Sequence, residues 1–414
     1  MKKVFLVLLP FLFLVCSSDA TDELTIAVPF GKEGELLIEQ LDQFCHEKNI
    51  KNITYTKLPI SLNEFDDEFI NSYLKTSICA DVIPIKNCWT APLTGMLEIL
   101  DTYQLDYELD MHLDSYVRNN YYYDNTLYSK LVALPYSADP VVLYINKALS
   151  EKYGFDKAIS FDQLEKQCLE VIQKEKNIGN SVEGFVFCYK PNGKLFETVC
   201  DMLRLSDGGA VVNESYQSTI GNSAAQNLFT SISRWIGTIT PEIEENGKIN
   251  ILDMIGKNEA LYVFAPASFS LSDNKKFFAK YRLSAFGYEG GSKLTARGYS
   301  YGIKRGCQRM NDALKIIRFI SSTKQQMLRY NKGLAFPTYK EFYAAYEQNN
   351  KFLEGILSDI YMSESCLSKD LVSNYFYVKE LFIDAIMPCI TNGQCTDVSN
   401  SFEYELLHLY NKAF

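Results

Sequence analysis

Apolar and polar positions along this chain repeat with two alternating periods. Short apolar runs at residues 24–28, 53–58 and 82–85 have the length of buried strands. Between them, apolar residues recur at helical spacing, first at Leu37, Leu41, Phe44 and Cys45 and then at Phe65, Phe69 and Tyr73. Strands that alternate with helices in this way predict a parallel sheet with helices packed on its faces.

The alternation continues to about residue 336. Further strands are predicted at 127–136, 141–145, 184–189, 260–264, 283–286 and 299–303, and helices at about 160–176, 195–205, 223–236 and 312–321. Beyond Pro337 the pattern is mostly helical. Because the chain exceeds the size at which one hydrophobic core stops growing, we expect two lobes.

The N-terminus has the pattern of a signal peptide over residues 1–20. Lys2 and Lys3 precede an apolar run at 4–15, and Ser18 to Ala20 offers small residues for cleavage. The run is shorter than the roughly 20 residues that span a membrane. We therefore expect a secreted or extracytoplasmic protein, with an uncleaved anchor as the alternative.

Charge argues against a nucleic-acid partner. Without residues 1–20 the chain keeps 39 basic and 50 acidic residues, which is a net charge of −11. Such a surface repels phosphate backbones, and no basic stripe interrupts it.

Ten cysteines follow residue 20, an even number that is typical of an oxidising compartment. Cys45 near the end of the first helix and Cys79 before the third strand are predicted at one edge of the sheet, so we expect them to pair. Cys389 and Cys395 flank the turn signal Asn392-Gly393 and are predicted to close a small loop. Free buried thiols are the alternative in each case.

Catalytic motifs are missing from the sequence. The three histidines, His46, His112 and His408, lie far apart, and there is no zinc pattern, nucleophile elbow or phosphate-binding loop. The acidic runs at 66–68 and 242–245 have the character of solvated faces. We predict no catalytic residue, no metal and no cofactor.

Several local motifs occur in an order that resembles one family. They are ADVIPIKNCWT at 80–90, ALPYSADP at 133–140, LYINK at 143–147, SFDQL at 160–164, Gly256-Lys257 before the strand at 260–264, and GYSYGI at 298–303. In this order they resemble the maltose- and multiple-sugar-type solute-binding proteins of ABC transporters, over about residues 24–340.

The resemblance implies an α/β, two-lobed periplasmic-binding-protein-like fold, each lobe a mainly parallel sheet flanked by helices, with several hinge crossings. Lobe 1 would comprise 21–136 with 284–333, and lobe 2 would comprise 137–283 with 334–414. The implied function is binding of a small polar solute, a mono- or oligosaccharide, between the lobes for transport or sensing. A membrane permease or receptor would be the partner of a monomeric protein.

The resemblance also implies a set of solute-binding residues. Carboxylates and amides would bind sugar hydroxyls, and aromatic rings would cover the apolar sugar faces. The implied residues are Lys32, Glu33, Asn87, Trp89, Tyr136, Asp139, Phe264, Gly298 and Tyr299. Most have a structural alternative: Lys32 and Glu33 as first-turn helix residues, Trp89 as a hydrophobic anchor, Asp139 as a turn residue before Pro140, Gly298 as a plain turn, and the tyrosines as packing.

Two positions depart from the family pattern. Many relatives carry an aspartate where this chain has Lys86, and a stacking tryptophan where it has Ala265. Exchanging an acceptor for a cation would favour an anionic or differently shaped solute.

Two other functions remain open. Thiaminase I, an enzyme, resembles these binding proteins and uses a cleft cysteine, but the stretch from Pro135 to Leu143 has none and only Cys88 can be placed near the solute. The chain could also be a secreted interaction protein that has lost solute binding.

Overall fold

The computed structural model of this chain describes residues 23–59, 80–90, 92–123, 129–155, 158, 160–189, 193–212, 218–242, 259–271, 280–284, 294–347, 375–395 and 398–413. The predicted signal peptide, the helix predicted around Phe65 and Phe69, and Cys79 lie outside these residues.

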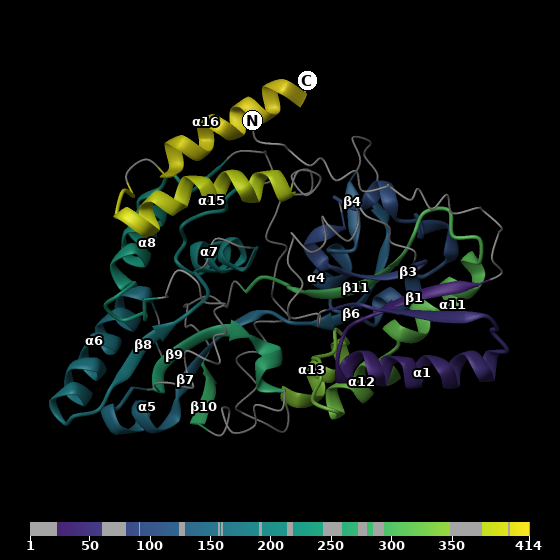
Figure 1. The fold of residues 1–414 in the computed structure, drawn as a ribbon, viewed down its shortest axis with the longest axis horizontal. Helices are drawn as coiled ribbons and strands as arrows, with labels where there is room; N and C mark the ends of the chain where they lie inside the picture. Colours follow the sequence, from purple (N-terminus) through teal and green to yellow (C-terminus); the bar gives the residue numbers. More distant parts are fainter. Residues whose placement is uncertain are drawn as a thin grey trace, which may run out of the picture.

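Two separate sheets form the two lobes, as the alternating pattern predicts (Figure 1). The first sheet has the order β2-β1-β3-β11-β6. Its strands are β1 (Leu24–Val28), β2 (Ile53–Lys57), β3 (Val82–Lys86), β6 (Ala133–Ala138) and β11 (Gly298–Ile303). β1 runs parallel to β2 and β3, whereas β11 runs antiparallel to β3 and β6. β11 therefore inserts a late segment of the chain between two early strands.

Helices cover the first sheet, and the sequence predicts two of them, at Lys32–Lys48 and Met310–Ser321. The covering helices are α1 (Lys32–Lys48), α3 (Asp106–Asp110), α4 (Asp114–Arg118), α11 (Met310–Ser321) and α12 (Thr323–Asn331). Leu37, Leu41 and Cys45 form the buried face of α1, at the predicted spacing. Beside the sheet, β4 (Tyr121–Tyr123) pairs antiparallel with β5 (Ser129–Leu131).

The second sheet has the order β10-β7-β9-β8. Its strands are β7 (Val141–Asn146), β8 (Val182–Val186), β9 (Glu259–Pro266) and β10 (Tyr281–Ser284), and its helices are α5 (Lys147–Tyr153), α6 (Phe161–Asn177), α7 (Gly193–Leu205) and α8 (Ser223–Trp235). β8 is parallel to β9, but β7 is antiparallel to both neighbours. The reason is that β7 enters directly from β6 across the junction, without a crossover helix. Ser160 caps α6, because its hydroxyl accepts from the Gln163 amide at 3.2 Å.

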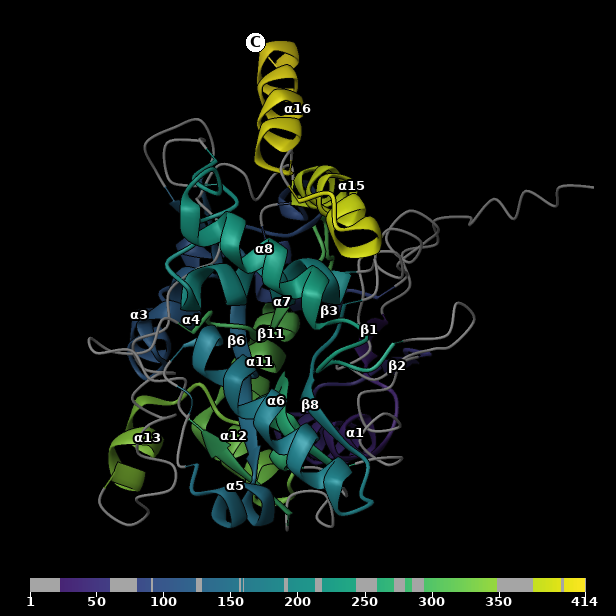
Figure 2. The ribbon, with the colours of Figure 1, turned by 90° about the vertical axis from the view of Figure 1, so that its left-hand side faces the viewer.

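The last helices divide between the lobes, unlike the prediction that all of 334–414 belongs to lobe 2. Thr338, before α13 (Lys340–Glu347), accepts from the Leu113 amide at 2.7 Å and bonds to the His112 ring at 2.7 Å. This segment stays on the first lobe because α12 ends there and only a short turn follows. α15 (Tyr375–Asn392) packs on α7 and α8, and α16 (Val398–Ala413) packs on α15. In Figure 2 this helical pair projects from one end of the molecule.

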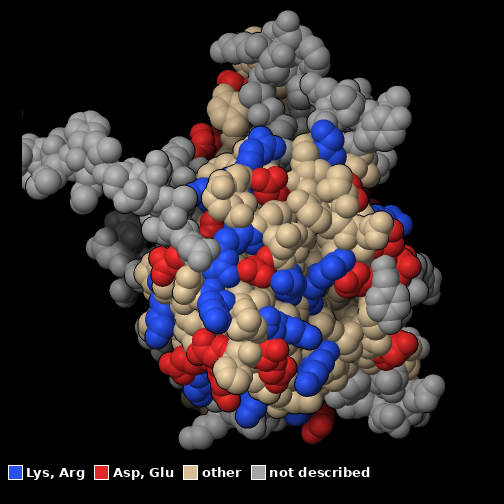
Figure 3. Space-filling model, turned by 90° about the vertical axis from the view of Figure 1, so that its right-hand side faces the viewer, with Lys and Arg blue, Asp and Glu red and all other residues tan. Residues whose placement is uncertain are grey.

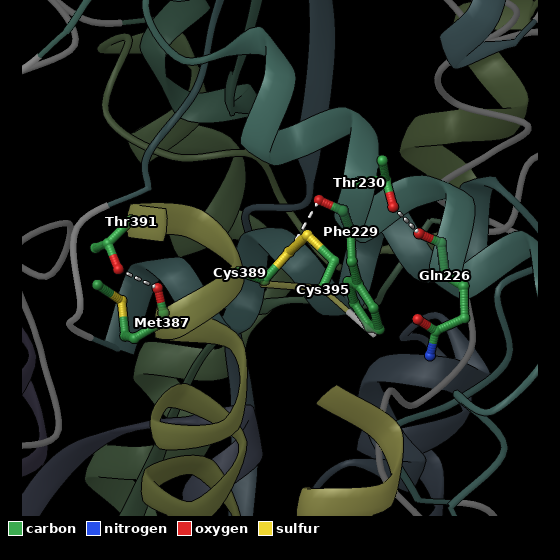
Figure 4. Close-up of a disulfide and its surroundings, with 7 residues drawn as sticks. All are labelled: Gln226, Phe229, Thr230, Met387, Cys389, Thr391 and Cys395. Carbon is green, nitrogen blue, oxygen red and sulfur yellow. Dashed lines mark hydrogen bonds between the residues drawn. A yellow bond between two sulfur atoms is a disulfide. The ribbon is translucent and has the colours of Figure 1, made fainter. Parts of the chain in front are cut away.

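The Cys389–Cys395 disulfide confirms one predicted pairing. It joins the end of α15 to the segment before α16, with a Cα–Cα distance of 4.3 Å. The Cys389 sulfur lies 3.3 Å from the carbonyl oxygen of Phe229 on α8 (Figure 4). The pairing of Cys45 with Cys79 is wrong, because Cys45 carries a free, buried thiol. Burial, together with the negative charges of Asp42 and Asp312, raises the pKa of that thiol.

No helix within the described ranges has the length and apolarity needed to cross a membrane. Figure 3 views the first lobe from its far end, where basic and acidic side chains are intermixed over the surface.

Candidate functional site

The predicted binding residues converge on one edge of the first sheet. β1, β3 and β6 end at this edge and β11 begins there, because β1 and β3 are parallel and β11 is antiparallel to β3 and β6. The edge therefore collects the predicted residues that follow or close these strands, namely Lys32, Glu33, Asn87, Trp89, Tyr136, Asp139, Gly298 and Tyr299. Phe264 lies on β9 of the second sheet, buried and paired with Leu143.

Glu33 places a carboxyl group in a buried position at this edge. It stands in the first turn of α1, which begins after Gly31, whose φ of 86° suits glycine. The oxygen Oε1 is buried and has no hydrogen-bond partner among the described residues. Burial raises the pKa of Glu33 to about 7, although the Tyr136 hydroxyl and the Arg329 guanidinium nearby work in the opposite direction.

Asn87 and Tyr136 add two further buried polar groups. The Asn87 oxygen accepts from the Ser300 hydroxyl on β11 at 3.0 Å, but its buried Nδ2 has no partner within the described chain. The Tyr136 hydroxyl is buried as well, and it lies close enough to the Glu33 carboxyl to lower the pKa of that group. Arg329 covers the Tyr136 ring, with the guanidinium carbon 4.0 Å from the ring centroid.

Trp89 and Gly298 have structural roles. Trp89 is fully buried in the turn η2 (Asn87–Trp89), and the Lys86 ammonium lies 5.3 Å from its ring centroid. The structure therefore favours a hydrophobic anchor over a ring open for stacking. A Cβ atom at Gly298 would lie 2.0 Å from the Ser137 carbonyl oxygen, so glycine is needed for β11 to pair with β6.

Lys32 and Tyr299 differ in accessibility. Lys32 is exposed at the start of α1, and Tyr299 is buried within the sheet, paired with Lys86 and Ser137.

Asp139 joins the two lobes at the crossing from β6 to β7. Its Oδ1 accepts from the Ser268 amide at 2.8 Å and its Oδ2 accepts from the Ser268 hydroxyl at 3.0 Å. Ser268 belongs to the turn η5 (Ala267–Ser270), which follows β9 of the second sheet. The Asp139 amide also donates to the Arg297 carbonyl, before β11, at 2.7 Å. Both carboxylate oxygens are thus engaged within the protein.

A network of ion pairs lies beside these residues, and the sequence alone did not assign it to the site. The Lys86 ammonium at the end of β3 lies 3.1 Å from Oε1 of Glu197 on α7. Arg297 Nε lies 3.0 Å from Oδ2 of Asp201, one turn further along α7, and Thr295 donates to the same carboxylate. Acids four residues apart share one helix face, which was the available signal.

These ion pairs change what Lys86 implies about the charge of the solute. Its charge is balanced by Glu197, and that of Arg297 by Asp201, so the case for an anionic solute loses its support. The other departure, Ala265, is buried in β9 beside Phe264.

Three kinds of residue bear on catalysis or metal binding: metal-ligating clusters, His112 and Cys88. No group of three histidine, cysteine or acidic side chains that could hold a metal occurs in the part of the chain that the structure describes. His112 is buried, with Nδ1 2.7 Å from the Thr338 hydroxyl and Nε2 3.2 Å from that of Ser321, and burial lowers its pKa to about 4. Cys88 belongs to η2, but its side chain lies outside the description.

Comparison with known proteins agrees with the architecture. No family model matches the sequence. A "Probable ABC transporter-binding protein" of Deinococcus radiodurans is 23% identical over 255 residues, which is 57% of each of the two chains. The chain thus matches little more than half the length of this relative.

Solved structures match almost the whole chain. Maltose-bound T. maritima MalE3 is 24% identical with a TM-score of 0.76. A solute-binding protein of Thermotoga lettingae bound to alpha-D-tagatose is 13% identical with a TM-score of 0.76, and one of Agrobacterium vitis with D-mannitol is 16% identical with a TM-score of 0.72. Each match covers 94% of this chain and 99% of the other.

Proposed function

From the two-lobed fold that this chain shares with sugar-type solute-binding proteins, we propose that it binds a small, neutral, polyhydroxylated solute between its lobes. The proteins to which it is similar are binding proteins and not enzymes. The mode of action is closure of the lobes on the solute, with no chemical step.

The single observation that carries the proposal is the group of buried polar atoms at the edge of the first sheet. Glu33 Oε1 and Asn87 Nδ2 are buried without a hydrogen-bond partner in the described part of the chain, and the buried Tyr136 hydroxyl lies beside the Glu33 carboxyl. A buried polar group without a partner costs about 1–3 kcal/mol. Solute hydroxyls, which both donate and accept, would satisfy the two groups without a partner and recover that free energy.

A neutral solute suits the charges at the site. Lys86 and Arg297 each pair with a carboxylate of α7, so the site supplies balanced charge. Glu33 with a pKa of about 7 is present in both forms near neutrality, and its protonated form donates to a hydroxyl. Among the alternatives, an enzyme of the thiaminase type rests on Cys88 alone.

Export and a transport partner follow as part of the same proposal. The disulfide between Cys389 and Cys395 fits an oxidising compartment. The fold is that of proteins that deliver solutes to ABC transporters, so we propose a membrane permease as the partner of a monomeric protein, with sensing as the second use.

The test is a thermal-shift screen of maltose, tagatose, mannitol and related sugars and polyols, followed by calorimetry. We expect one of them to bind, and we expect Asn87→Ala to weaken that binding at least tenfold. Asn177→Ala, at the exposed end of α6, is the control and should bind like the wild type. Absence of binding across the screen, or normal binding by Asn87→Ala, would contradict the proposal.

A further inference from the structure

The ion pairs between β3 and α7 connect the two lobes directly. Lys86 belongs to the first sheet, where β3 pairs with β1 and β11. Glu197 belongs to α7, which packs against α8 and α15 of the second lobe. The two side chains are only 10% and 14% exposed, and 3.1 Å separates ammonium and carboxylate.

Arg297 extends this contact into a network. Its Nη1 lies 3.6 Å from Glu197 Oε2, its Nη2 donates to the Glu197 carbonyl at 2.7 Å, and its Nε reaches Asp201 at 3.0 Å. The Arg297 carbonyl accepts from the Asp139 amide, so the network begins at the lobe crossing. Two cations on the first-sheet side thus bind two acids on one face of α7.

From this geometry we infer that Lys86 and Glu197 form a latch that holds the lobes together without solute. The solute occupies the space between the lobes, so the latched form admits no solute and must open first. Lys86 and Glu197 are parts of the latch and not solute ligands. The contacts that form the latch lie within the chain, so only the second of the two tests below requires a solute.

Two neighbours make Lys86 suited to this role. Trp89 lies beneath its ammonium group, and this cation–π contact fixes the position of the amine. β3 holds the backbone of Lys86 opposite Tyr299 of β11. The cation is therefore held in place on one lobe while its counter-charge stands on the other.

The first test measures shape without solute. Small-angle scattering of Lys86→Met and Glu197→Gln should show a radius of gyration roughly 1 Å larger than the wild-type value of about 21 Å. The double variant should be no larger than Glu197→Gln, because that single variant already loses the contacts of Glu197 with both Lys86 and Arg297. Lys280→Met is the matched control, because it breaks an exposed pair with Glu259 on the second sheet, and it should scatter like the wild type.

The second test uses a solute from the screen above. Opening the latch enlarges the population that can bind, so Lys86→Met should bind roughly three- to tenfold more tightly than the wild type. Weaker binding with an unchanged radius of gyration would make Lys86 a solute ligand and overturn the latch. Unchanged scattering of both variants overturns it as well, and that result stands even if no solute is found.

Discussion

Buried polar side chains separate into two kinds at the residue scale. Asp139 and Lys86 have partners within the chain, whereas Glu33 Oε1 and Asn87 Nδ2 are buried without one in the described residues. The first kind holds the protein together, and the second kind is the one that we propose contacts the solute. Sequence patterns identify all four positions but do not distinguish the two kinds.

Glu33 makes the stability depend on pH in a specific direction. Its pKa is about 7 in the folded protein against 4.5 for the free side chain, so the folded state binds more protons between these values. Stability therefore falls as pH rises from about 4.5 to about 7. Glu33→Gln removes this loss of stability and should be more stable than the wild type by about 3 kcal/mol at pH 8.

Chemical denaturation at about pH 5 and pH 8 measures the difference. If the free energies of unfolding of the wild type and of Glu33→Gln differ by the same amount at both pH values, the burial of Glu33 does not shift its titration. Glu35→Gln, on the exposed side of the same helical turn, is the control and should show no such pH dependence.

Asp139 is expected to matter for stability more than for solute binding. Asp139→Ala loses two hydrogen bonds to Ser268, and the free energy of unfolding should fall by about 2 kcal/mol. The double variant with Ser268→Ala should fall by less than the sum of the two single variants. Thermal melts decide this, and an unchanged melting temperature combined with weaker solute binding would restore Asp139 as a solute ligand.

At the scale of elements, the sequence predicts the strands of the two sheets and the longer helices up to α11 because they have a clear apolar period, but it does not predict the short helices α3 and α4 or α12. It also predicts that the ends of β1, β3 and β6 meet, since parallel strands share an edge. It cannot predict that Glu197 on α7 reaches Lys86, because 111 residues separate the two and only the lobe arrangement brings them together. For the same reason the burial of Trp89 and the lobe of residues 335–340 were not predictable.

The disulfide stabilises the junction of α15 and α16. It closes a short loop, for which the loss of chain entropy gives about 2 kcal/mol. Cys389→Ser with Cys395→Ser should therefore lower the melting temperature by a few degrees and speed proteolysis of α16. Cys307→Ser removes a free thiol and serves as the control. Equal proteolysis of both variants would show that packing on α8 is sufficient.

At the scale of the whole molecule, the two sheets are connected by β6 running into β7 and by the segments that lead to β11 and to α15. The shared fold accounts for this plan, which is why a resemblance based on short motifs predicts it. The latch that we infer adds a contact between Lys86 and Glu197 to this plan.

The hydrogen bonds of Asp139 to Ser268 and Arg297 have a mechanical consequence. They fasten three segments at one point, so a rotation of one lobe against the other must pivot close to that point. During such a rotation, the displacement of an atom grows with its distance from the pivot. We therefore expect the largest displacements at α6 and at the far end of α1, which lie at opposite ends of the molecule in Figure 1. Spectroscopic labels on exposed Lys174 and Glu47 would report such motion with the greatest sensitivity, whereas labels near Asp139 would stay almost still.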